Sequence, residues 1–348
     1  MTIGVGEIGG IAPKITIRDV AKAAGVSVGT ASRVLNGRSN VDAKLKKAVE
    51  NAVASLGYHP SILAQNMKSG AKRTVGILLT DITVPSLSVL VRTAQEELNA
   101  AGYSVIIGLH RYSVEREREL LRFLPGRVDG LIMSTCSENE EQLVKMRSSL
   151  RIPLVLRDRD VPSTASSVRI LHRAATRRAT EYLIDLGHRR IALITGKPPL
   201  YPARARIEGY EEALRERGIE VDRNLMGTNA FASTGGFTDL STILESPNRP
   251  TALVLGGAGM LPPTLEIVRN LGLRIPQDLS IIGSSDSDLA RLATPPVTVL
   301  RWNDVEMGKL CAGLMLAQLS SSQSAPQHLF LEAELVIRDS CAPPPHKA

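Results

Sequence analysis

The chain has 348 residues and a net charge of +7, and its 43% hydrophobic and 22% charged residues are typical of a globular protein with two or three domains. We expect neither a membrane span nor an export signal, because there is no apolar run of about 18 residues and residues 1–10 lack a basic region followed by an apolar one. Cys136, Cys311 and Cys341 have no metal-ligand spacing and are typical of free thiols in a reducing cytoplasm.

The positive charge is concentrated near the N-terminus. Residues 14–73 contain 11 Lys and Arg but only three acidic residues, so the remaining chain is close to neutral. A basic segment on a near-neutral body is the electrostatic pattern of a nucleic-acid-binding module. A basic surface that only improves solubility would give the same pattern, so charge alone leaves both interpretations open.

Three short helices are predicted before residue 60. A capping box that begins at Thr16 starts the first helix, and Gly25 ends it. Ser27 caps the second helix, while Asp42 caps the third and Gly57 terminates it. Two short helices joined by a turn that contains glycine are typical of a helix-turn-helix.

Two stretches of this region carry a specific resemblance. Residues 15–37 run ITIRDVAKAAGVSVGTASRVLNG, and residues 56–60 run LGYHP. Both are closely similar to the headpiece of the lac repressor (LacI/GalR) family of bacterial transcription regulators. The resemblance implies a cytoplasmic regulator, more often a repressor than an activator, that binds a near-palindromic double-stranded DNA operator as a homodimer.

The second helix is the expected reader of base sequence. Its N-terminal end can enter the major groove, where Arg33 can bond a guanine bidentately and Val28 can contact a thymine methyl. Hydroxyl groups nearby are better suited to phosphates, and the alternative for Arg33 is a solvated surface arginine. The expected DNA contacts are Thr16, Ser27, Val28, Gly29, Thr30, Ser32, Arg33, Asn36, Tyr58, Ser61, Ala64, Gln65 and Met67.

Residues 61–68 have helical spacing but form too short a helix to be stable alone. In the family this hinge helix folds only on the operator, where a leucine wedges into the minor groove. Met67 stands at that place, and an unbranched apolar side chain can still wedge and kink the duplex; the alternative is that Met67 packs on the core. The expected domains are a headpiece at 14–60, a hinge and linker at 61–73 and a core at 74–340.

From Thr74 the hydrophobic pattern changes to alternating strands and helices. Apolar strands are expected at 74–80 and 128–135, among others, and a helix–Gly–strand join recurs at Gly102 and Gly187. This alternation predicts parallel sheets covered by helices on both faces. Together with the resemblance, it implies an all-α helix-turn-helix headpiece followed by an α/β core of two lobes, similar to periplasmic binding proteins, with an effector held between the lobes.

The expected cleft departs from the family's polar pattern. Leu171 and His172 stand where the family usually has an Asp–Asn pair, and Gly257 and Ala258 stand where it has an Asn–Asp pair. Carboxylates and amides hold vicinal hydroxyls, so their loss argues against a simple neutral sugar. His172 is instead expected to add positive charge.

The groups that remain favour a small-molecule effector with an anionic group. Arg206 is expected on the first turn of a helix, where the helix dipole also favours negative charge. Trp302, the only tryptophan, can stack on a ring. Two alternatives stay open: an eroded pocket that senses nothing, and an Arg206 that only braces the fold through Asp158 or Asp286. The expected effector contacts are Asp81, Ser86, Ser134, Asp158, Arg206, Asp286 and Trp302.

Catalytic and metal-binding interpretations find little support. A GxGxxG pattern at residues 4–9 has no preceding strand or following helix, and no GxSxG or Walker sequence occurs. We therefore expect no enzyme activity, no cofactor and no metal, and we expect His110 and Asp160 to be surface residues. A solute-binding protein without a DNA role is the alternative, against which the basic N-terminal segment argues.

Overall fold

The computed structural model describes residues 15–35, 41–58, 72–138, 140–160, 165–228, 238–321 and 325–345. The chain divides into two compact units, residues 1–72 and 73–348. Among the described residues, no helix is both long and apolar enough to cross a bilayer.

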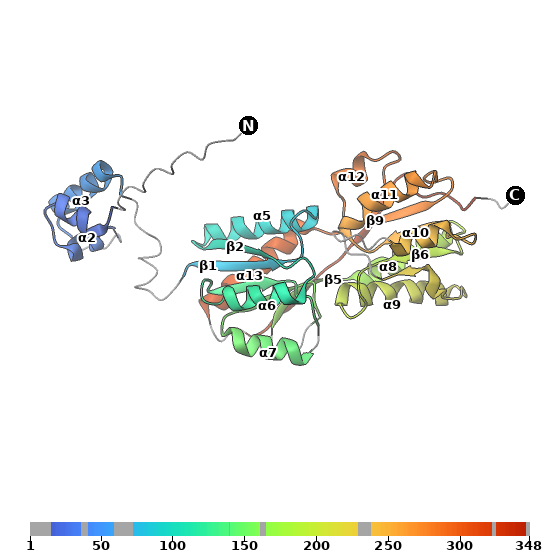
Figure 1. Ribbon diagram of the computed structural model, residues 1–348, viewed down its shortest axis with the longest axis horizontal. Coiled ribbons are helices and arrows are strands. Elements are labelled where there is room, and N and C mark those ends of the chain that lie inside the picture. The colour runs from blue at the N-terminus through green and yellow to red at the C-terminus, as the bar shows by residue number, and fades with distance from the viewer. Residues whose placement is uncertain are drawn as a thin grey trace, which may run out of the picture. The chain divides into compact units, whose positions relative to one another are not determined.

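The first unit holds three helices around a small core of Val20, Ala31 and Val49 (Figure 1). The predicted caps are present: Thr16 and Asp19 form the capping box, and the Asp42 carboxylate accepts a hydrogen bond from the backbone N–H of Lys44 at 2.8 Å. The helices are α1 (Ile17–Ala23), α2 (Val28–Leu35) and α3 (Ala43–Leu56).

The second unit consists of two α/β lobes, each built on a six-stranded sheet. Lobe 1 has the strand order β11-β5-β4-β3-β1-β2, and the pairings within it are parallel. Its strands are β1 (Thr74–Leu79), β2 (Ser104–Leu109), β3 (Gly130–Met133), β4 (Leu154–Arg157), β5 (Ser166–Ile170) and β11 (His328–Leu331). Its helices are α5 (Pro85–Ala100), α6 (Val114–Phe123), α7 (Glu140–Leu150) and α13 (Asp304–Ser320).

Lobe 2 has the strand order β12-β10-β9-β8-β6-β7, with β12 antiparallel to β10. Its strands are β6 (Ile191–Ile194), β7 (Met226–Gly227), β8 (Ala252–Leu255), β9 (Ser280–Ser284), β10 (Thr298–Arg301) and β12 (Glu334–Val336). Its helices are α8 (His172–Asp185), α9 (Tyr201–Glu216), η1 (Arg223–Leu225), α10 (Thr238–Glu245), η2 (Ala258–Met260), α11 (Leu261–Asn270) and α12 (Asp288–Leu292).

Helices cover both faces of each sheet, as the alternating sequence predicts (Figure 1). In lobe 1, α5 and α13 pack on one face through residues such as Leu90 and Met315, and α6 packs on the other through Leu120. The chain passes from lobe 1 to lobe 2 after β5, returns after β10 and passes again after β11. Trp302, directly after β10, therefore lies on a connection between the lobes.

Candidate functional site

The N-terminal end of α2 offers an exposed surface to a partner. Val28 is 44% exposed on the first turn, and the carbonyl of Gly29 accepts a hydrogen bond from Nε of Arg33 at 3.3 Å. The Ser27 hydroxyl accepts from the backbone N–H of Thr30 at 3.1 Å, which caps the helix. Since Ala31 faces the core, α2 is held by one side and leaves Val28 and Arg33 on the other.

The remaining expected DNA contacts fall into two groups. Thr16 is exposed but donates its hydroxyl to Asp19 at 2.7 Å, and Tyr58 packs partly on the helical core. Ser32 lies on α2 and is half-buried. Five expected contacts lie outside the described residues and stay predictions: Asn36, Ser61, Ala64, Gln65 and Met67. Six basic side chains on the three helices are exposed, namely Arg18, Lys22, Arg33, Lys44, Lys46 and Lys47.

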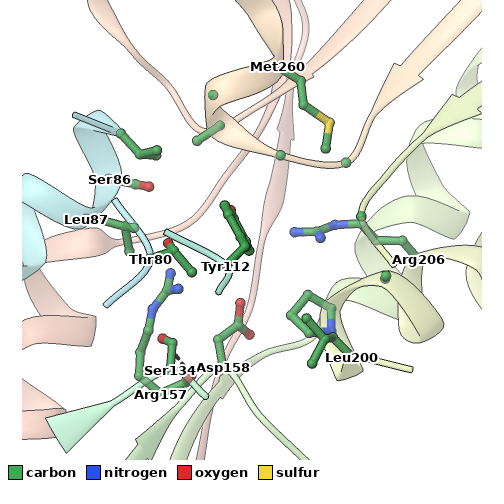
Figure 2. Close-up of a pocket in the computed structure, with 18 of the residues that line it drawn as sticks. Thr80, Ser86, Leu87, Tyr112, Ser134, Arg157, Asp158, Leu200, Arg206 and Met260 are labelled. Carbon is green, nitrogen blue, oxygen red and sulfur yellow. Dashed lines mark hydrogen bonds between the residues drawn. The ribbon is translucent and has the colours of Figure 1, made fainter. Parts of the chain in front are cut away.

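A cavity lies between the two lobes, where the carboxyl ends of their parallel strands meet, and the space in it and at its open mouth totals about 820 Å³. Figure 2 shows Arg157 and Arg206 entering it from opposite sides with Asp158 between them. Lobe 1 contributes Thr80, Val84, Ser86, Leu87, Tyr112, Ser134, Arg157, Asp158 and Arg159. Lobe 2 and the connection after β10 contribute Gly196, Lys197, Leu200, Pro202, Ala203, Arg206, residues 256–260 and Trp302.

Arg206 belongs to α9 but lies one turn further along the helix than the sequence suggested, because α9 begins at Tyr201. Its guanidinium has neither a hydrogen bond nor an ion pair with any described residue. Burial lowers the pKa of Arg206 to about 10, against the opposing attraction of Asp158. The salt bridges to Asp158 and Asp286 that would make Arg206 a brace are therefore not formed within the described part of the chain.

Arg157, the last residue of β4, is the second arginine of the cavity. It is only 9% exposed, and its Nε has no hydrogen-bond partner among the described residues. Sequence reasoning chose its neighbour Asp158 and missed Arg157. The signal was available, because any residue at the carboxyl end of a parallel strand is a candidate for the cleft.

Asp158 is buried and takes part in a pair with His172. Its oxygens Oδ1 and Oδ2 each lie 3.0 Å from Nε2 of His172. Burial raises the pKa of Asp158, but His172, Arg157 and Arg206 outweigh this and hold the pKa below its usual range. Burial lowers the pKa of His172 to about 4, helped by the charge of Arg206. His172 is thus neutral near pH 7, and the expectation that it adds positive charge is wrong.

Trp302 forms part of the cavity wall and is 9% exposed. Its Nε1 donates a hydrogen bond to Oδ1 of Asp304 at 2.7 Å. Burial raises the pKa of Asp304 to about 6. The indole is therefore fixed at one end while its ring borders the cavity.

The other expected effector contacts differ in their positions. Ser86 and Ser134 line the cavity, and the Ser134 hydroxyl donates to the carbonyl of Arg157 at 3.1 Å. Asp81 is not part of the lining, and its carboxylate accepts hydrogen bonds from Thr83. Asp286 also lies outside the lining and is surrounded by arginines. Oxygens of Asp286 lie 2.7 Å from Arg338, 3.4 Å from Arg301 and 3.6 Å from Arg291.

His110 was expected at the surface, and this expectation is wrong, because His110 is buried. Its Nδ1 lies 2.9 Å from Sγ of Cys136, and its Nε2 lies 2.8 Å from the carbonyl of Ser134. Glu117 completes the cluster by accepting hydrogen bonds from Thr135 and from the backbone of Cys136. Burial raises the pKa of the Cys136 thiol, with Glu117 adding to the effect. Hydrogen bonding within lobe 1 accounts for all three side chains.

Similarities to known families cover most of the chain. Residues 16–61 match the family described as "Bacterial regulatory proteins, lacI family", and residues 180–341 match the "Periplasmic binding protein-like domain". The "Ribose operon repressor" of Escherichia coli (strain K12) is 33% identical over 328 residues, which is 93% of this chain and 99% of that protein. The "HTH-type transcriptional repressor PurR" of Glaesserella parasuis is 30% identical over 93% of this chain and 98% of that protein.

Solved structures resemble the chain over a similar span. The lac repressor dimer bound to operator and the anti-inducer ONPF has a TM-score of 0.82 at 27% identity, covering 95% of this chain and 100% of that chain. A complex of the transcriptional regulator CelR with cellobiose has a TM-score of 0.69 at 29% identity, covering 94% of this chain and 99% of that chain.

Proposed function

This chain belongs to the lacI family of bacterial regulatory proteins, and from that premise we propose that it couples transcription to the level of a small anionic molecule. The chain is a DNA-binding transcription regulator of the repressor type, with a helix-turn-helix headpiece and an effector-binding core, and it acts on operator DNA as a dimer. What is new in the proposal is the chemistry of the effector and the residues that contact effector and DNA.

The place of action and the lack of catalysis follow from the same premise. A protein whose partner is chromosomal DNA acts in the cytoplasm, and we propose that location for this chain. We also propose that the cleft binds its ligand without converting it. The named relatives are repressors, and a ligand that controls DNA binding acts through its occupancy alone.

For the headpiece, the exposed side of α2 supports direct reading of bases. Val28 is apolar and exposed at the first turn, where a thymine methyl would be its partner. Arg33 is exposed one turn beyond Gly29, and its fork would recognise a guanine. Two such headpieces in a dimer would read two related half-sites, so the operator is expected to be nearly palindromic.

For the core, the observation that carries the proposal is Arg206. Arg206 is half-buried, lines the cavity and has no hydrogen-bond partner or ion pair among the described residues. A bound anion would supply a charge-assisted partner for its guanidinium. The cavity lies between two α/β lobes, which is a usual place for a small-molecule site. Trp302 and the apolar side chains Leu87 and Met260 would contact the uncharged part of the ligand.

Two steps test this function. First, the full-length protein is used to select duplexes from a random pool, and enrichment of a palindrome is expected; failure to enrich any sequence would refute specific DNA binding. Second, the selected duplex is titrated with protein in the presence of anionic and neutral metabolites. We expect at least one anionic compound to change the operator affinity of the wild type and of the control Arg189→Met, whose arginine is exposed outside the cleft, but not of Arg206→Met. If no compound changes that affinity, the cleft is an eroded pocket.

A further inference from the structure

We propose that the effector presents anionic oxygens to both lobes at once, with Arg157 of lobe 1 and Arg206 of lobe 2 as the two ends of a clamp. This inference rests on the effector site proposed above and names the class of its ligand. The class is a small molecule with a phosphate monoester, or with two carboxylates, in place of a single carboxylate.

The surroundings of Arg157 leave part of its guanidinium group without a hydrogen-bond partner among the described residues. More than nine-tenths of this side chain is buried, it lines the cavity, and Nε has no hydrogen-bond partner among the described residues. Buried polar groups in folded proteins nearly always have partners, and an unpaired buried charge is especially costly. A donor left in this condition beside an open cavity indicates a partner that arrives with the ligand.

The charged side chains that line the cavity are mostly positive. Arg159 is already engaged, because its Nε donates to the carbonyl of Thr135 and lies 3.7 Å from Glu138. Asp158 is the ionised carboxylate in the lining, and it faces both Arg157 and Arg206. Asp304 is not part of the lining; burial raises its pKa to about 6, and the charge of Arg157 opposes that shift. The lining thus holds two guanidiniums without hydrogen-bond partners among the described residues and one carboxylate that is already bonded to His172, and the exposed Lys197 at the rim adds a further positive charge.

The directions of the two arginine side chains also restrict the shape of the ligand. The two arginines come from different lobes and enter from opposite sides of the cavity (Figure 2). One carboxylate offers two oxygens in a plane and is satisfied by one guanidinium fork. Two guanidinium groups on opposite walls require either the oxygens of a phosphate, which do not lie in one plane, or two separate carboxylates.

The start of α5 adds a donor on the lobe 1 side. Pro85 has no N–H, and the N–H of Leu87 donates to the carbonyl of Val84 at 2.9 Å, so the backbone N–H of Ser86 is the first-turn donor that has no partner among the described residues. Ser86 in that turn lines the cavity and is 4% exposed. A helix N-terminus favours an anion, which agrees with Arg157 on the same lobe. A ligand held in this way would draw the two lobes together.

Stability of the ligand-free protein gives the first test. If Arg157 waits for a ligand, Arg157→Met removes an unpaired buried charge and should raise the melting temperature of the full-length chain in a buffer without phosphate or carboxylate. Arg189→Met, on the exposed surface, should leave it unchanged. A lower melting temperature for Arg157→Met would show that Arg157 braces the fold, and the clamp would be wrong.

Binding of simple probes gives the second test. Inorganic phosphate, succinate and acetate are titrated into the wild type, Arg157→Met, Arg206→Met and Arg189→Met, with Trp302 fluorescence and thermal shift as readouts. We expect phosphate or succinate to bind the wild type more tightly than acetate, and each cleft variant to weaken that probe by at least about tenfold. A stronger response to phosphate than to succinate identifies the phosphate class, and the reverse identifies the dicarboxylate class.

Three results of the probe titrations would contradict the clamp. Equal binding of all three probes to the wild type, or binding to none, overturns the clamp, and so does full affinity of Arg157→Met for the better probe. These results leave the proposed function standing, since that function fails only if no metabolite alters operator affinity through Arg206.

Discussion

The indole of Trp302 and the imidazole of His172 meet edge to face, with ring centroids 6.0 Å apart and planes inclined at 87°. The same imidazole holds the carboxylate of Asp158, the acidic group in the wall of the cavity. Contacts thus link Trp302, on the connection after β10, through His172 to Asp158 in the wall of the cavity. Because Trp302 is the only tryptophan of the chain, tryptophan fluorescence reports on the surroundings of this residue alone.

The first prediction concerns base recognition by α2. Arg33→Ala should cost about 1 to 3 kcal/mol at one G·C position of the operator and relax specificity there, because a bidentate contact to guanine is lost. Gel-shift titrations on the operator, on a variant of that base pair and on unrelated DNA measure this. The control is Lys46→Ala, which removes an exposed charge from α3. Equal weakening on all three duplexes would instead make Arg33 a phosphate contact.

The second prediction concerns Met67, which lies outside the described residues. Met67→Gly should weaken operator binding and reduce the bend in the DNA, because no apolar wedge remains to separate the central base pairs. Met67→Leu should retain both properties. A circular-permutation assay measures the bend, and an unchanged bend in the glycine variant would refute the wedge.

The third prediction concerns pH and Asp304. Burial raises the pKa of its carboxyl from 3.8 to about 6, so between those values the folded protein keeps a proton that the unfolded chain releases. The folded state therefore loses stability as the pH rises through this range. Asp304→Asn stays neutral and can still accept from Trp302, so it should be more stable than the wild type by about 1 to 2 kcal/mol at pH 7.5.

The pH series provides the check on that prediction. The gain from Asp304→Asn should shrink towards zero below about pH 3, where the wild-type carboxyl is protonated in both states. Glu220→Gln, at an exposed position, should show no such trend. A gain that is constant with pH would mean that packing, and not ionisation, causes the difference.

Much of the fold was accessible from local sequence signals. Capping residues such as Thr16 and Asp42 act on backbone groups within three residues, so the sequence alone identifies the helix starts. Long apolar strands such as β1 were equally clear. The short strands β7 and β12 were not predicted, because segments of two and three residues carry no periodicity.

The cleft was less accessible, because its properties depend on residues far apart in the chain. Asp286 is of a residue type that often contacts ligands, but its carboxylate accepts hydrogen bonds from Arg301 and Arg338 outside the cavity. His172 looks cationic in the sequence, whereas burial beside Arg206 makes it neutral. The place of Arg157 at the end of a strand made it a candidate for the cleft, but only the fold reveals that its Nε is buried without a partner among the described residues.

The most direct test of the central claim, that an anion bound at the arginines of the cleft sets operator affinity, is a coupling measurement on the full-length chain. Operator dissociation constants are measured with and without saturating effector, for the wild type and for Arg206→Met. We predict a change of at least about fivefold for the wild type, within the usual range of allosteric coupling, and no change for the variant. An Arg206→Met protein whose operator affinity responds to the same effector as strongly as the wild type would contradict the account.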